Sequence, residues 1–115
     1  MTRELLEEIC LSKKGATYDI KWGKDLCYLI GEKMWCATGT EPPFHVGFKT
    51  TPEDFASLTE RQGIEPAKYL ARAHWITVKE LHSLSKEEWE QQLEQAYQLV
   101  FQKLTKKKQR EILGE

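Results

Sequence analysis

Four short β-type segments separated by tight turns constrain the fold of this chain more than any other feature of its sequence. Two of the separations, Gly23-Lys24 and Gly31-Glu32, consist of a glycine followed by one polar residue. Such a pair is typical of a two-residue type II′ hairpin turn, because glycine accepts the positive φ of the first turn position. We therefore expect an antiparallel meander formed by the segments 17–22, 25–30, 33–38 and 44–49.

Helical patterns lie before and after this meander. Each predicted helix begins with a capping signal, provided by Thr2, by Thr51-Pro52, and by Ser85 with Glu88 three residues later. One further β-type segment, 74–79, precedes the last helix. The predicted order is α-β-β-β-β-α-β-α. It indicates an α+β fold in two layers, with the helices packed on one face of an antiparallel sheet.

The predicted turns set the register of the strands and therefore the faces of the sheet. With Gly31-Glu32 as a two-residue loop, Cys27 is expected opposite Cys36 and Tyr28 opposite Trp35. The face expected under the helices is wholly apolar and comprises Tyr18, Ile20, Cys27, Leu29, Met34 and Cys36. Tyr28 and Trp35 are then expected on the other face, open to solvent. There they would bind a partner, or only stiffen the sheet or form a dimer contact.

The three cysteines, Cys10, Cys27 and Cys36, have no spacing typical of a metal site. A directly opposed Cys27–Cys36 pair is close enough for a disulfide. Two small apolar residues on the core face are the expected interpretation, because the protein is expected to be cytoplasmic and its thiols reduced.

The charge balance does not favour any class of partner. The chain has 17 basic and 18 acidic residues, a formal net charge of −1. A surface for nucleic acid therefore requires local segregation of charge. The most basic segment is the C-terminal one, 106–115, expected to be a solvated tail or else a phosphate-binding tail. We expect one domain over 1–115, a monomer or weak dimer, with no apolar segment long enough for a membrane.

Motifs for catalysis are not found in the sequence. His45, His74 and His82 are scattered, without partners at the spacing of a metal site or catalytic triad. There is no glycine-rich phosphate loop and no nucleophile motif. We therefore expect a non-enzymatic protein, without catalytic residues, metal or cofactor.

The sequence resembles the MmcQ/YjbR family over nearly its whole length. The resemblance lies in the order and spacing of several segments: Cys10-Leu11-Ser12, Gly15-Ala16-Thr17, Gly31-Glu32-Lys33-Met34-Trp35, the helix at Pro52, 74–78 and 96–100. It implies a fold like that of frataxin (CyaY) and a DNA-binding role through a double wing of β-hairpins. Two positions depart from the family pattern, Ala73 before the His-Trp pair and Ile20-Lys21-Trp22-Gly23 after the first strand.

Together these patterns predict a DNA-binding protein. The residues expected to contact DNA are basic or aromatic residues of the open face, the hairpins and the segment before the last strand: Lys21, Lys24, Lys33, Trp35, Lys49, Arg72 and His74. The alternative is a module that binds a small molecule or a protein through the same aromatic face.

Overall fold

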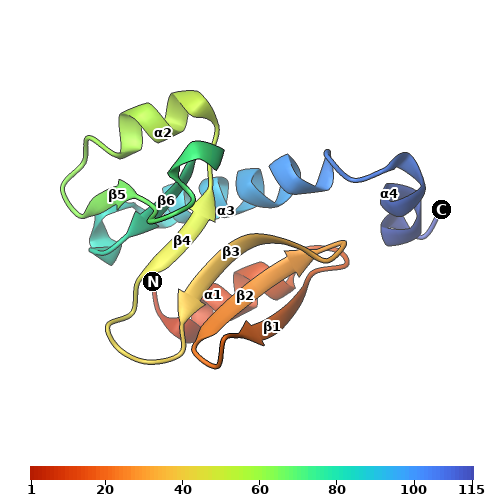
Figure 1. The fold of residues 1–115 in the computed structure, drawn as a ribbon, viewed down its shortest axis with the longest axis horizontal. Coiled ribbons are helices and arrows are strands. Elements are labelled where there is room, and N and C mark those ends of the chain that lie inside the picture. Colours follow the sequence, from red (N-terminus) through yellow and green to blue (C-terminus); the bar gives the residue numbers. More distant parts are fainter.

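The computed structural model describes all 115 residues and contains a six-stranded antiparallel sheet in the order β1-β2-β3-β4-β6-β5 (Figure 1). The strands are β1 (Thr17–Lys21), β2 (Asp25–Ile30), β3 (Lys33–Gly39), β4 (Val46–Lys49), β5 (Ile64–Pro66) and β6 (Trp75–Val78). The helices are α1 (Arg3–Leu11), α2 (Pro52–Leu58), α3 (Lys86–Phe101) and α4 (Lys106–Leu113), with 3₁₀ turns η1 (Ala71–Ala73) and η2 (Leu81–Ser83). None of the helices is both long and apolar enough to cross a bilayer.

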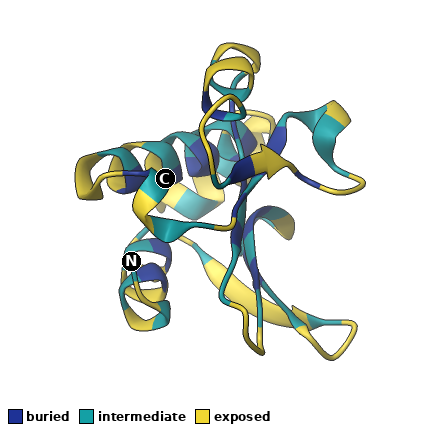
Figure 2. Ribbon diagram, turned by 90° about the vertical axis from the view of Figure 1, so that its left-hand side faces the viewer, coloured by how far each residue is buried: buried dark blue, intermediate teal, exposed yellow.

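The predicted α+β class, with helices packed on the sheet, is confirmed. Helix α3 packs against the centre of the sheet through its apolar side, on which Trp89, Leu93 and Tyr97 are buried. Helix α1 adds Leu6 and Cys10 to the same core. Figure 2 shows the sheet from the side, with most of strand β1 exposed and projecting away from the helices. Neither α1 nor α3 covers the opposite face of the sheet, which is called here the open face.

The predicted helix starts are also correct. Thr2, Thr51 and Ser85 each accept a hydrogen bond, at 3.1 Å, from the backbone N–H three residues further on. These bonds satisfy backbone donors that the first turn of a helix leaves free. The local sequence is therefore sufficient to fix where α1, α2 and α3 begin.

Two elements were not predicted. The three-residue strand β5 pairs with the outer side of β6 and extends the sheet to six strands. The segment expected as a basic tail forms helix α4, capped by Thr105. Leu104 and Ile112 hold this segment on the domain, because their side chains pack against the core beside the turns that contain Gly31 and Gly15. The basic segment is thus packed on the domain, although Lys106, Lys107 and Lys108 remain exposed.

The register predicted for the first hairpin is wrong by one residue. Lys21 pairs with Asp25, so the loop comprises the three residues Trp22, Gly23 and Lys24 and not two. Trp22 and Gly23 both adopt positive φ, 54° and 73°. Tyr18 therefore pairs with Tyr28, and Ile20 pairs with Leu26. Both side chains lie on the helix side of the sheet, but β1 is an edge strand that the helices do not cover, so Tyr18 and Ile20, predicted to be buried, are 56% and 52% exposed.

A β-bulge between β2 and β3 is the second difference from the predicted register. Leu29 pairs with Met34 as predicted, but Tyr28 pairs with Cys36, so Trp35 is the extra residue. Tyr28 and Trp35 are 1% and 0% exposed, and the Trp35 ring contacts Tyr97 of α3 at a centroid distance of 5.7 Å. The prediction that this aromatic pair lies on the open face is wrong. It lies in the core, beneath α3.

The bulge at Trp35 also separates the two cysteines that were expected to oppose each other. Cys27 pairs with Ala37 on the open face, whereas Cys36 pairs with Phe48 in the core, where its thiol lies beside Cys10. Burial raises the pKa of the Cys36 thiol well above its ordinary value, and the neighbouring Cys10 thiol raises it further. A Cys27–Cys36 disulfide does not fit this sheet, because the two side chains lie on opposite faces.

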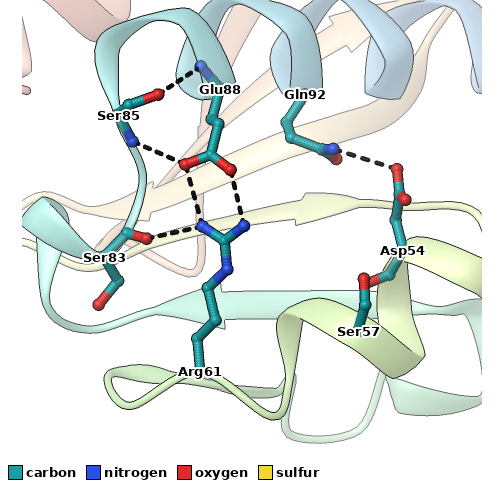
Figure 3. Close-up of polar contacts among 7 residues, drawn as sticks. All are labelled: Asp54, Ser57, Arg61, Ser83, Ser85, Glu88 and Gln92. Carbon is teal, nitrogen blue, oxygen red and sulfur yellow. Dashed lines mark hydrogen bonds and ion pairs between the residues drawn. The ribbon is translucent and has the colours of Figure 1, made fainter.

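An ion pair joins the segment after α2 to the start of α3 (Figure 3). Arg61 donates two hydrogen bonds to Glu88, at 2.9 and 2.7 Å, and a third to the Ser83 carbonyl oxygen at 3.0 Å. Glu88 also accepts from the Ser85 backbone N–H and so completes the capping box. The hydrogen bonds from Arg61 contribute most, and the one from the Ser85 backbone contributes less; together they lower the pKa of Glu88 from 4.5 to about 2.

Replacing Glu88 by glutamine is expected to reduce the free energy of unfolding at neutral pH by about 1 kcal/mol or less, because the pair is partly exposed and screened. A carboxylate whose pKa is lowered by folding stabilises the folded state above its unfolded pKa, and this stabilisation is lost as the pH falls. The difference between wild type and variant should therefore shrink from about pH 4.5 toward pH 2. Urea unfolding at several pH values measures it. Glu87→Gln, in the same turn but without an ion pair, is the control, and a pH-independent difference would contradict the assignment.

Candidate functional site

The structure does not bring the seven predicted contact residues together on one surface. Lys21 and Lys24 lie at the tip of the β1–β2 hairpin. Lys33 and Lys49 lie at the other end of the sheet, beside the C-terminal end of α3. Trp35 is fully buried and has no surface on which a partner could stack.

The remaining two predicted residues, Arg72 and His74, lie next to Lys49. The Lys49 ammonium donates a hydrogen bond of 2.8 Å to the carbonyl oxygen of Ala73, the residue between them. Arg72 is exposed in η1. The His74 ring packs edge-on against Phe55 at 5.5 Å, so it supports α2 and is only partly available to a partner.

Three lysines surround a hollow of about 280 Å³ at the end of the sheet near α3, called here the lysine hollow. They are Lys33 from β3, Lys49 from β4 and Lys103 from the segment after α3. The other lining residues are all apolar: Met34, Trp75, Val100 and Leu104. No carboxylate lines the hollow, and none of the three lysines forms an ion pair. The hollow therefore presents uncompensated positive charge over an apolar floor.

The environment of Lys49 shows the consequence of this grouping. Burial lowers the pKa of the Lys49 ammonium, and the positive charge of Lys103 lowers it further by a smaller amount. An anion placed between the two lysines would relieve their repulsion and favour the charged form of Lys49. The arrangement can therefore bind an anionic group such as a phosphate without first breaking an ion pair.

A second hollow, of about 450 Å³, lies on the open face and is called here the open-face hollow. A cross-strand row of small residues forms its floor: Cys27, Ala37, Gly47 and Thr77. Its sides include Trp22 at the tip of the first hairpin, Tyr69 and Leu70 in the loop after β5, and Trp75. Met34 and Trp75 line both hollows, so the two adjoin.

Several residues of these hollows were not predicted as contacts, namely Trp22, Tyr69, Trp75 and Lys103. Lys103 belongs to the basic C-terminal run, which was recognised, but its position beside Lys33 and Lys49 depends on how α3 packs. Trp75 could be recognised only from the register of β6, in which it pairs with Lys49. Trp22 and Tyr69 lie in turns at positive φ, a backbone conformation that aromatic residues rarely adopt and that the sequence does not indicate.

A six-stranded antiparallel sheet, with helices on one face and hollows on the other face and at its end, defines this protein as a small α+β domain. Its sequence matches the YjbR family model over residues 11–99. The chain therefore belongs to the YjbR family, as its resemblance to MmcQ/YjbR proteins predicted.

Solved structures agree with this assignment. Protein DR2400 of Deinococcus radiodurans, described as a DUF419 domain, superposes with a TM-score of 0.87 and 25% sequence identity, over 96% of this chain and 87% of that one. A protein from Pseudomonas syringae gives a TM-score of 0.70 and 23% identity, over 86% and 98% of the two chains, and shows the same fold. No curated protein sequence matches this chain.

Proposed function

We propose that this protein is a non-enzymatic DNA-binding protein whose lysine hollow holds the phosphates. The observation that carries the proposal is the convergence of Lys33, Lys49 and Lys103 around one hollow without a carboxylate. A chain with a formal net charge of −1 has no general attraction for DNA, so such local segregation is the feature that the interaction requires.

Further basic residues lie around the lysine hollow. Helix α4 begins two residues after Leu104 and presents Lys106, Lys107 and Lys108 to solvent. Arg72 lies next to Ala73, whose carbonyl oxygen accepts the Lys49 hydrogen bond. Phosphates that neighbour one held in the lysine hollow would meet these side chains. Lys21 and Lys24 remain predicted contacts at the far end of the open face, where a longer DNA would reach the first hairpin.

Binding is expected to be weak and to depend strongly on salt. With three phosphate contacts, the slope of log K against log salt concentration should be about −2 to −3, so affinity should fall roughly 15- to 65-fold between about 50 and 200 mM salt. Fluorescence anisotropy with labelled single-stranded and duplex DNA measures this slope. If neither DNA is bound at low salt, the proposed function is wrong.

A further inference from the structure

The floor of the open-face hollow is open because of a glycine that the backbone does not require. Gly47 lies in the middle of β4, between Ala37 and Thr77, and its φ is not in the left-handed region. A Cβ atom added there would lie 3.4 Å from the Ile76 carbonyl oxygen and 3.9 Å from its next neighbours, which are ordinary contacts. The strand therefore has room for a Cβ atom at this position. Glycine within a strand weakens it and can mark a place where a ligand approaches the backbone.

Two exposed aromatic residues flank this floor in conformations that cost free energy. Trp22 and Tyr69 are 76% and 91% exposed and adopt φ values of 54° and 70°. Positive φ is unfavourable for bulky residues, and neither ring regains this cost through burial in the protein. Both side chains line the hollow, together with the buried Trp75. These aromatic surfaces are suited to stacking on a flat ligand.

The charge of the adjoining lysine hollow indicates which flat ligand would fit. A ligand that extends past Trp75 and Met34 passes from an aromatic hollow to three lysines. It must therefore combine a flat apolar group with a nearby anionic group, which describes a nucleotide unit of DNA. The volume of about 450 Å³ lies within the range of sites for small organic groups.

Resting on the DNA-binding function proposed above, we infer that the bound DNA is single-stranded, with one unpaired base in the open-face hollow and its phosphates in the lysine hollow. In a duplex both faces of a base are covered by its neighbours. Only an unpaired base is free to stack on protein aromatic side chains without first being unstacked.

Anisotropy with a labelled 15-nucleotide oligothymidine and with a 15-base-pair duplex at about 50 mM salt tests this inference. The single strand is expected to bind at least about tenfold more tightly than the duplex. Gly47→Val should fill the floor of the hollow, and Tyr69→Ala should remove one stacking surface. Each should weaken single-strand binding roughly tenfold and leave the weaker duplex binding unchanged.

Tyr18→Ala is the matched control for Tyr69→Ala. Tyr18 is also exposed, but it pairs with the buried Tyr28 and so lies on the helix-covered side of β1. Its replacement should leave both affinities unchanged. Because Tyr69 is almost fully exposed, Tyr69→Ala remains informative even if Gly47→Val does not fold, which circular dichroism would show.

The results separate this inference from the function on which it rests. Equal affinities for the two DNAs, or full single-strand affinity in Tyr69→Ala, would overturn the inference and leave salt-dependent DNA binding intact. Absence of binding to either DNA at low salt would overturn both.

Discussion

Replacing both Lys33 and Lys103 by glutamate is expected to weaken DNA binding by on the order of 100-fold at about 50 mM salt. Each lysine that neutralises a phosphate contributes close to one unit to the salt slope, so the slope should fall by about two units. Both side chains are exposed, so the fold should tolerate the change. Anisotropy titrations at several salt concentrations give both quantities.

The control for this experiment compares two ends of the same helix. Lys86 is the first residue of α3, and Lys103 follows its last turn. Both are exposed, and Lys86→Glu changes the net charge by the same amount as Lys103→Glu. Only the second should reduce affinity, because only Lys103 lines the lysine hollow. Equal losses would mean that binding depends on net charge alone, and an unchanged double variant would exclude the lysine hollow as the phosphate site.

Trp35→Ala is expected to have the largest effect on stability, a loss of about 3–5 kcal/mol in the free energy of unfolding. The Trp35 side chain is fully buried and contacts both Tyr28 and Tyr97, so its removal leaves a cavity between the sheet and α3. Domains of this size have about 5–15 kcal/mol in total, so the variant should be marginally stable. Urea unfolding followed by circular dichroism measures the loss.

Two further tryptophan variants make this prediction specific. Trp22→Ala should change the free energy of unfolding by no more than about 0.5 kcal/mol, because Trp22 is 76% exposed. Trp35→Phe should cost less than Trp35→Ala, because most of the ring is kept and the buried Trp35 Nε1 has no hydrogen-bond partner to lose. If Trp35→Ala instead kept full stability, the side chain would lie on the surface, and the bulged register would be wrong.

The comparison of the two hairpins shows how far turn residues predict a register. At Gly31-Glu32 the two-residue loop is correct, although both residues have positive φ (55° and 69°), which makes it a type I′ turn and not the expected type II′. At Gly23 the glycine lies in the middle of a three-residue loop, because Trp22 also adopts positive φ. Sequence patterns place glycines in turns reliably, but they do not count the residues of a loop.

The buried face of the meander was predicted wrongly for the same reason. Strands β2 and β3 contain apolar residues on both faces, so their composition does not show which side faces the helices. The assignment then depended on register alone, and a shift of one residue in the first hairpin together with a bulge at Trp35 reversed it. A strand with one clearly polar face would have resisted this error.

The elements that could be predicted from sequence are those with local causes: the starts of α1, α2 and α3, the principal strands, and hence the α+β class and family. Capping residues and apolar periodicity act within a few residues, so they can be read directly. The burial of Tyr28 and Trp35 and the meeting of Lys33, Lys49 and Lys103 could be seen only in the folded chain. Both depend on the register of the strands and on the packing of α3 against them, to which residues far apart in the chain contribute together.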